Sequence, residues 1–177
     1  MRRLLLSSLF KSPRTTEAPA VSEAALAELA GTVKLEAKRI LGRSLAIRVV
    51  DAGSCNGCEL EIHALNNAIY DLERFGIRFV ASPRHADVLL VTGPVTCNMK
   101  IALERTHAAI PGPKWVVAVG DCACNGGLYA DSPACIGAVS NILDVDLHIP
   151  GCPPSPTMLL SGLTALITRS RNNRQGK

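Results

Sequence analysis

The sequence is poor in aromatic residues. Phe, Trp and Tyr make up only 3% of its 177 residues, and they are not interleaved with basic side chains. Nucleic-acid-binding domains are recognised by clustered basic patches and by motifs of known spacing. No such motif is present, so the sequence gives no support for DNA or RNA binding.

Long apolar runs are also missing. A helix needs about 20 apolar residues to span a bilayer, whereas the longest candidate run, Leu4 to Phe10, is interrupted by two serines. Two arginines precede this run, but it is short for a signal peptide and no small-residue cleavage site follows closely. We expect a chain that does not cross the membrane by itself. Its first residues then form an interfacial anchor, a partner-docking segment or a frayed terminus.

Charge is modest and concentrated at the ends. The formal net charge is +4, and basic residues gather near both termini, where they would attract anionic surfaces or acidic partners. The length and the 47% hydrophobic content suit one domain with its own core. We expect an N-terminal basic tail and linker over residues 1–21, the domain over 22–168, and a basic C-terminal tail over 169–177.

Short apolar runs alternate with longer helical patterns through the domain. Strands are expected at residues 46–53, 77–81, 86–93, 114–121 and 145–151, and helices at 22–41, 58–75, 97–110 and 155–168. This alternation is typical of βαβ units and a parallel sheet. The runs VLLV and WVVAV have no polar alternation, as in strands covered on both faces. The sequence predicts one three-layer α/β/α domain with five strands in the order 2-1-3-4-5.

The helix expected after Cys58 has a clear apolar face. Ile62, Leu65, Ile69 and Leu72 recur at helical spacing, and Gly76 closes the pattern. We expect this face to pack on the sheet.

The seven cysteines are the main chemical signal. Without a convincing export signal, they indicate metal ligands or reduced thiols rather than disulfides. Cys55, Cys58, Cys97, Cys122 and Cys152 each follow the end of an expected strand. Because sites in open parallel sheets form outside the carboxyl ends of the strands, we expect these thiols to gather at one edge.

Three kinds of site are compatible with such thiols. Four thiolates can bind zinc or an iron–sulfur cluster. A zinc knuckle would pair Cys55 and Cys58 with Cys122 and Cys124, although structural zinc usually replaces a core that this domain already has. A thioredoxin-like dithiol at Cys55 and Cys58 needs no distant cysteines at the same edge. A redox cluster accounts best for the whole set, and the flanking glycines would let backbone N–H groups approach its sulfurs.

Four longer segments carry a family resemblance. SCNGCELEI, YDLERFGIRFVASPRHADVLLVTGPVT, PKWVVAVGDCACNGG and IPGCPPSP resemble the small subunit of membrane-bound [NiFe] hydrogenases of the formate-hydrogenlyase type, and they look similar to the 20 kDa subunit of complex I. The resemblance implies a flavodoxin-like fold with one proximal [4Fe–4S] cluster bound by Cys55, Cys58, Cys122 and Cys152. The first loop reads CxGC, which resembles hydrogenases rather than the adjacent cysteine pair of complex I.

The resemblance also implies a function and partners. It implies an electron-transfer subunit of a membrane-associated complex, peripheral on the cytoplasmic side of the inner membrane, with a [NiFe] site in the large subunit. The implied partners are this hydrogenase or complex I-type large subunit, a ferredoxin-like iron–sulfur subunit and integral membrane subunits. One alternative is a complex I-like NADH/quinone oxidoreductase subunit that passes electrons to quinone. Another is a zinc-stabilised interaction module without a redox role.

The remaining polar candidates are interpreted more simply. Cys97, Cys124 and Cys135 fall outside the family's ligand pattern, and Cys97 is expected to be a small buried residue unless it takes part in the site. A buried carboxyl at Glu59, next to Cys58, could relay protons, or Glu59 is a helix N-terminal acid favoured by the dipole. The histidines His63 and His85 are expected to be packed or hydrogen-bonded rather than ligands, and Glu61 to lie at the surface.

Overall fold

The central sheet consists of five parallel strands. The structure is a computed structural model that describes residues 28, 31–32, 34–35, 38–39 and 41–175. The strands are β1 (Leu45–Asp51), β2 (Ile77–Phe79), β3 (Val88–Thr92), β5 (Trp115–Val119) and β7 (Leu147–Ile149). They lie in the order β2-β1-β3-β5-β7, and each neighbouring pair is parallel. The predicted strand order is confirmed.

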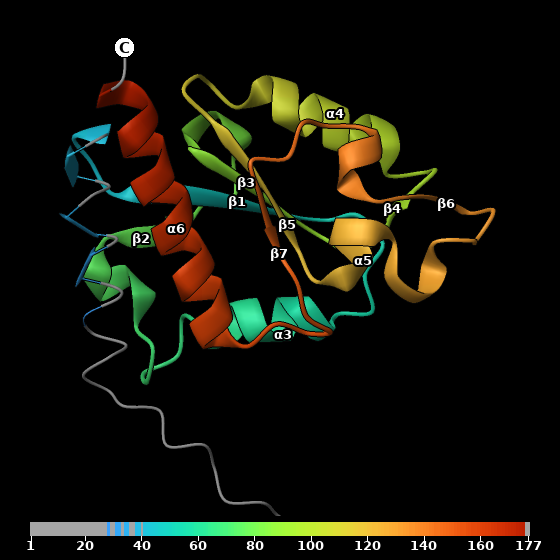
Figure 1. The fold of residues 1–177 in the computed structure, drawn as a ribbon, viewed down its shortest axis with the longest axis horizontal. Helices are drawn as coiled ribbons and strands as arrows, with labels where there is room; N and C mark the ends of the chain where they lie inside the picture. Colours follow the sequence, from blue (N-terminus) through green and yellow to red (C-terminus); the bar gives the residue numbers. More distant parts are fainter. Residues whose placement is uncertain (1–27, 29–30, 33, 36–37, 40, 176–177) are drawn as a thin grey trace, which may run out of the picture.

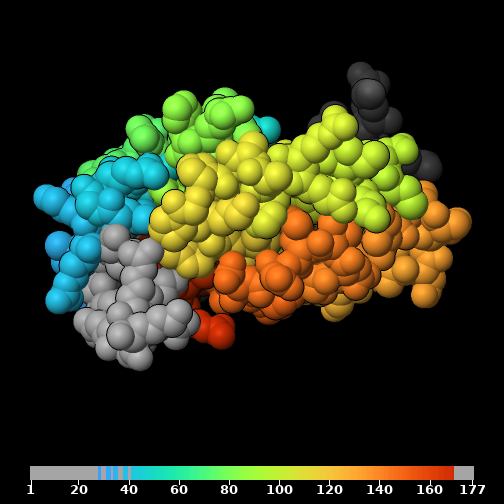
Figure 2. Space-filling view, turned by 90° about the horizontal axis from the view of Figure 1, so that it is seen from above, coloured from blue at the N-terminus to red at the C-terminus, as the bar shows by residue number. Residues whose placement is uncertain are grey.

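Helices cover both faces of the sheet. The longer elements are α3 (Gly57–Ala64), α4 (Lys100–Ala109), α5 (Asp121–Asn125) and α6 (Pro156–Gln175). In Figure 1, α3 and α6 lie on one side of the sheet and α4 on the other. Seen from above, α4 and the segment after β6 (Cys135–Gly137) lie side by side over that second face (Figure 2). The three-layer prediction is therefore confirmed.

Each central strand feeds two cores because its side chains alternate between the faces. In β3, Val88 and Leu90 pack in the core beneath α3 and α6, whereas Leu89 and Val91 pack in the core beneath α4. All of these side chains are buried. This two-sided burial is why the strand sequence shows no polar alternation.

The helix after Cys58 is shorter than predicted. It ends at Ala64, and a separate 3₁₀ turn, η1 (Leu72–Phe75), follows it. Between them, the Asn67 side chain accepts hydrogen bonds from the N–H groups of Ile69 and Tyr70, so it offers the backbone an alternative to the helix. As a result Ile69 is 69% exposed instead of packing on the sheet.

The next helix starts later than predicted. The residues just before it form β4 (Val95–Thr96), which pairs with β6 in a small antiparallel sheet. The Thr96 N–H also donates to the Ala52 carbonyl, and the Cys97 N–H donates to the Ala134 carbonyl. These bonds occupy the backbone of the segment, so α4 begins only at Lys100.

The first and last helices agree with the predictions in position but not in every boundary. The described residues between 28 and 41 are helical, and residues 22–27 of the expected helix lie outside the described residues. The last helix begins at Pro156 as predicted and continues to Gln175, into the segment expected to be a tail. Short 3₁₀ turns complete the fold: η2 (Pro83–His85), η3 (Gly127–Tyr129) and η4 (Val139–Asn141).

Candidate cysteine site at the carboxyl edge of the sheet

Four cysteines from three segments come together at one edge of the sheet. Cys55 and Cys58 follow β1, Cys122 lies at the start of α5 after β5, and Cys152 follows β7. The pKa of Cys58 is raised to about 12, first by burial, then by the charge of Glu59, and then by Cys122, Cys55 and Cys152. Thiols that act on one another in this way are spatial neighbours, although up to 97 residues of chain separate them.

Cys122 has the same neighbours. Burial raises the pKa of its thiol most, and the charges of Cys152 and Cys55 raise it further. A backbone hydrogen bond with Leu128 acts in the opposite direction. A negative charge on either thiol is therefore unfavourable unless a cationic group compensates it.

Two glycines make room for the sulfur atoms. A Cβ on Gly120 would lie 2.6 Å from the Cys58 Sγ, and a Cβ on Gly127 would lie 2.8 Å from the Cys122 Sγ. Both glycines also have positive φ angles, 85° and 52°, which other residues rarely adopt. The backbone therefore forms a close cradle around the thiols, and any side chain at these two positions would intrude on it.

The loop after β1 is fixed by its own side chains. The Asp51 Oδ1 accepts hydrogen bonds from the N–H groups of Gly53 and Ser54, at 2.8 and 2.7 Å. Asn56 adopts a left-handed conformation with φ of 70° just before α3. These features turn the chain so that Cys55 and Cys58 lie on either side of the tight Asn56–Gly57 step.

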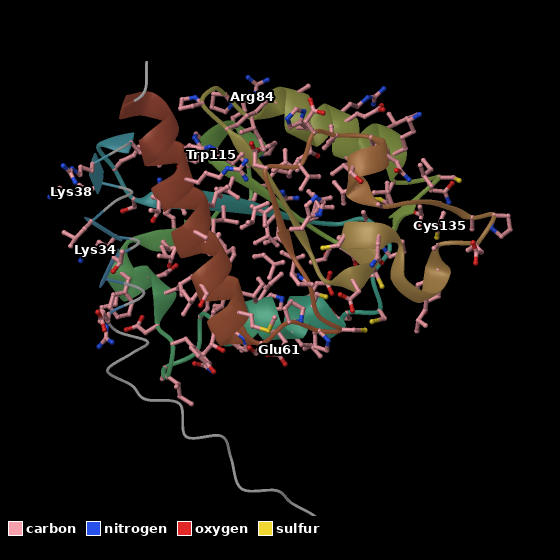
Figure 3. All side chains as sticks on the ribbon, viewed as in Figure 1. Lys34, Lys38, Glu61, Arg84, Trp115 and Cys135 are labelled. Carbon is pink, nitrogen blue, oxygen red and sulfur yellow. The ribbon has the colours of Figure 1, made fainter. Side chains whose placement is uncertain are left out.

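The other three cysteines lie apart from this group. Cys97 is exposed, which corrects the expectation of a buried residue, and its thiol donates to the Pro133 carbonyl at 3.8 Å. The Cys124 thiol is half-buried and donates to the Ala118 carbonyl at 3.6 Å. Cys135 lies in β6, opposite Thr96 (Figure 3). None of the three contributes to the raised pKa of Cys58 or Cys122.

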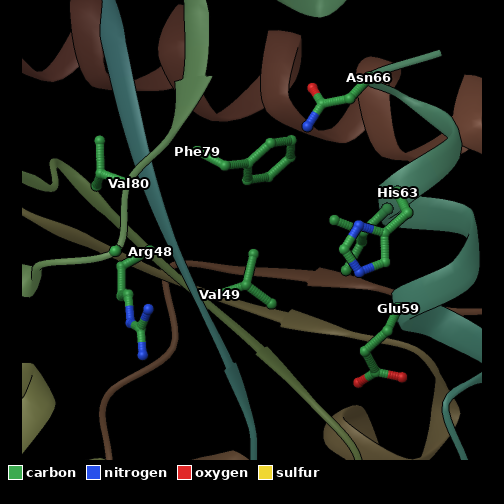
Figure 4. Close-up of a pocket in the computed structure, with 9 residues that line it drawn as sticks. Arg48, Val49, Glu59, His63, Asn66, Phe79 and Val80 are labelled. Atoms are coloured by element: carbon green, nitrogen blue, oxygen red, sulfur yellow. The ribbon is translucent and has the colours of Figure 1, made fainter.

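Glu59 lies beside the cysteines in an unusual environment. It is only 9% exposed, and both of its carboxylate oxygens are buried without a hydrogen-bond partner in the described structure. The carboxylate lines a pocket of about 290 Å³ together with His63 on α3 and Arg48 on β1 (Figure 4). Burying an unpaired carboxylate is unfavourable, so Glu59 lowers the stability of the isolated chain unless a partner or a bound group compensates its charge.

Arg48 is a pocket residue that was not predicted from the sequence. Its Nε atom is buried without a partner, and apolar walls from Val49, Ile62 and Phe79 surround it and Glu59. The signal was present as a single charged residue in the otherwise apolar strand AIRVV. The pocket itself could not be foreseen, because it forms where β2 ends at Phe79 while β1 continues to Asp51.

The remaining polar candidates are at or near the surface. His63 and His85 are exposed, and Glu61 is partly exposed on α3 (Figure 3). Among the described residues, no three His, Cys, Asp or Glu side chains gather closely enough to hold a single metal ion. The ligands of one metal ion must lie close together, whereas the ligands of a [4Fe–4S] cluster bind separate irons and lie farther apart than the ligands of one zinc.

Large apolar side chains surround the cysteine segments. Leu60 follows Cys58 on α3, Leu128 and Tyr129 follow α5, and Met158 lies in the first turn of α6. All four are substantially exposed, and Leu128 is 91% exposed. Exposed apolar patches of this kind often mark protein–protein interaction sites.

The fold and the site define a class. It is that of single-domain α/β oxidoreductase subunits whose cysteines gather at the carboxyl edge of a parallel sheet. The family model described as NADH ubiquinone oxidoreductase, 20 Kd subunit, matches residues 55–166. The chain belongs to this family.

Similar proteins come from both hydrogenases and quinone reductases. A probable membrane-bound hydrogenase subunit mbhJ from Pyrococcus furiosus is 42% identical, over 74% of this chain and 78% of the relative. Formate hydrogenlyase subunit 7 from Escherichia coli is 42% identical, over 76% of this chain and 53% of the relative. A subunit of the NADH-quinone oxidoreductase from Heliobacterium modesticaldum is 40% identical, over 65% of this chain and 66% of the relative.

A solved structure shares the fold. A chain of the membrane-bound sulfane sulfur reductase, an archaeal respiratory membrane complex, aligns with a TM-score of 0.66 and 36% identity, covering 80% of this chain and 76% of that one. Similar proteins thus include parts of membrane-bound complexes. In the part of this chain that the structure describes, no helix is long and apolar enough to span a membrane.

Proposed function

We propose that this chain is the electron-transfer small subunit of a membrane-associated [NiFe] hydrogenase complex, and that Cys55, Cys58, Cys122 and Cys152 hold one [4Fe–4S] cluster. The observation that supports it best is the meeting of these four thiols in a cradle where Gly120 and Gly127 leave no space for a Cβ. When bound, the cluster supplies one-electron redox chemistry. The residues of this chain would hold it, and because Cys55 and Cys152 are exposed, the cluster would lie at the surface where a partner can approach it.

The hydrogenase branch is favoured by the first loop. Cys55 and Cys58 are separated by Asn56 and Gly57, and a Cβ on Gly57 would lie 3.6 Å from the Cys55 Sγ and 3.9 Å from Pro153. The loop thus packs against the turn that follows Cys152. The resemblance associates this CxGC spacing with hydrogenases, and two of the relatives named above are hydrogenase or formate hydrogenlyase subunits.

The proposed partners follow from the exposed apolar side chains around the cysteines. Leu60, Leu128, Tyr129 and Met158 would be covered by a large subunit that carries the [NiFe] site. A ferredoxin-like iron–sulfur subunit and integral membrane subunits would complete the complex. The chain would be peripheral, on the cytoplasmic side of the inner membrane.

Glu59 is proposed as a proton carrier of this complex. Glu59 adjoins Cys58 and lines the pocket, and its two carboxylate oxygens are buried without a hydrogen-bond partner among the described residues. A carboxyl group in such a position can take up and release a proton next to the cluster. Its position in the first turn of α3 also fits the simpler interpretation of a helix N-terminal acid.

A second candidate function is electron transfer to a quinone. The pocket beside Glu59 has apolar walls and a few polar groups, which is the usual composition of a site for a small organic ligand. One of the relatives named above is a subunit of an NADH-quinone oxidoreductase. In this case the large subunit would lack nickel.

The test is metal analysis and low-temperature EPR on the complex purified through a tag on this chain, before and after reduction with dithionite. Iron, nickel and a reduced S = 1/2 cluster signal are expected. Iron without nickel would favour the quinone reductase. Zinc without iron would overturn the electron-transfer function and favour the interaction module.

A further inference from the structure

An aspartate ties together the segments that carry Cys122 and Cys152. The Asp121 N–H donates to the Gly151 carbonyl at 2.9 Å, and the Gly151 N–H donates to the Asp121 Oδ1 at 2.8 Å. Each of these two residues directly precedes a cysteine in the sequence. The reciprocal pair therefore fixes the separation of the two loops immediately next to the thiols.

The same bonding pattern occurs twice at the opposite edge of the sheet. Asp146 and Val116 exchange the same two bonds at 2.9 and 2.8 Å where β7 and β5 begin. Asp87 and Ala46 exchange them at 2.8 and 2.9 Å where β3 and β1 begin. At that edge the pattern only joins neighbouring strands, because no cysteine follows.

The Asp121 pair extends the sheet beyond its last regular residue. The Gly120 N–H donates to the Ile149 carbonyl at 2.8 Å, so three successive bonds join the loops after β5 and β7. Gly151 has a φ of 135°, and a Cβ there would lie 2.7 Å from the Pro154 Cα. Gly151 is therefore suited to this turn because it has no side chain, and the Asp121 carboxylate accepts its N–H.

Asp121 also places a negative charge beside the thiols. Its Oδ1 is bonded to the Gly151 N–H, so the carboxylate lies beside the residue that precedes Cys152, and Asp121 itself precedes Cys122. Any group bound by these thiols therefore lies within the field of this carboxylate, and a negative charge there opposes the addition of an electron.

We infer that Asp121 is a positioning residue that sets the spacing of Cys122 and Cys152 through its bond to Gly151 and lowers the reduction potential of the cluster through its charge. This inference rests on the proposed function. It separates two effects of one side chain, the accepted hydrogen bond and the charge, which different substitutions remove.

The test uses the intact complex with two substitutions at Asp121 and the same two at Asp146. Asp121→Asn keeps an acceptor oxygen for the Gly151 N–H and removes the charge, whereas Asp121→Ala removes both. Asp146→Asn and Asp146→Ala are matched controls on the same pair of strands, at the edge without cysteines. The measurements are iron per complex, the midpoint potential from an EPR-monitored redox titration, and the thermal unfolding temperature.

We expect Asp121→Asn to keep its iron and to show a more positive midpoint potential, and Asp121→Ala to lose the iron of one [4Fe–4S] cluster, about four irons per complex. The Asp146 variants should lower the unfolding temperature and leave iron and potential at wild-type values. A wild-type potential in Asp121→Asn, or the same shift in Asp146→Asn, would overturn the inference even if Asp121→Ala does not fold. Absence of iron from the wild-type complex would instead overturn the proposed function.

Discussion

Gly120 and Cys58 are so close that a Cβ on the glycine would lie 2.6 Å from the Cys58 sulfur. Gly120 lies between β5 and α5 and Cys58 in the first turn of α3, and the missing side chain lets the two segments approach. Gly120 also has a φ of 85°, so a substitution there is strained regardless of the contact.

Gly120→Ala should therefore displace the Cys58 thiol. We expect the complex to lose the iron of one [4Fe–4S] cluster, about four irons, and the free energy of unfolding to fall by about 1–3 kcal/mol, the usual cost of overpacking. Iron analysis and thermal unfolding measure the two effects. Gly31→Ala is the control, because nothing lies within 4 Å of a Cβ at that helical position. Wild-type iron in Gly120→Ala would contradict the proposed geometry of the site.

Serine substitutions should divide the cysteines into two sets. Cys122→Ser and Cys152→Ser should abolish the reduced cluster signal, because a hydroxyl is a poor ligand for iron in such clusters. Cys97→Ser and Cys135→Ser should leave the signal unchanged, since both residues lie in or next to the small antiparallel sheet. EPR spectra and iron content of the four complexes check this, and loss of signal in Cys97→Ser would require a different ligand set.

Glu59→Gln tests the proton carrier. The amide fills the same space, so iron content and the cluster signal should remain at wild-type levels, while hydrogen turnover falls by about 10²-fold or more, as for other general acid–base groups. If Glu59 only stabilises the N-terminus of α3 through the helix dipole, Glu59→Gln should leave hydrogen turnover unchanged. Thermal unfolding would then show only a small loss of stability.

Acid should weaken the fold through His107. Its pKa is lowered, mainly by burial and then by the charge of Lys114. A depressed pKa means that the folded state resists protonation, so the stability it contributes is complete above the unfolded value of about 6.5 and is lost as pH falls through the folded value. The unfolding temperature should fall less between pH 7.5 and pH 5 in His107→Asn than in the wild type. If the unfolding temperature fell equally in both proteins, groups other than His107 would be responsible for the acid sensitivity.

The topology was accessible from the sequence because parallel strands leave a clear pattern. Uninterrupted apolar runs such as VLLV and WVVAV are found where both faces of a strand are covered, and here they form β3 and β5. The positions of Cys55, Cys58, Cys122 and Cys152 followed from the same reasoning. Cys97 was expected with them, but the chain first forms β4 after β3 and places Cys97 apart from the other four. Fold and approximate site therefore depend on patterns that are local in the sequence.

The missed features depend on contacts that no local pattern encodes. The apolar residues after Cys58 keep a regular helical spacing, which predicted that Ile69 would pack on the sheet. The turn formed by the Asn67 side chain interrupts the helix, and Ile69 is exposed instead. The Asp121–Gly151 pair joins residues 30 positions apart. Its role becomes visible only when β5 and β7 are seen as neighbours.

The exposed apolar side chains around the cysteines should form the contact with the large subunit. Leu128 is the best single test, because it is 91% exposed and lies next to Gly127, whose missing Cβ leaves room for Cys122. Leu128→Asp should leave folding intact, since the side chain contributes little to the core, but a charge in the centre of an apolar interface would be buried without a partner. The yield of large subunit in a tag purification should fall at least tenfold.

Ile101→Asp on α4, where the side chain is 58% exposed on the other face of the sheet, is the matched control and should leave the yield unchanged. An equal loss in both variants would mean that the partner does not dock on the cysteine edge.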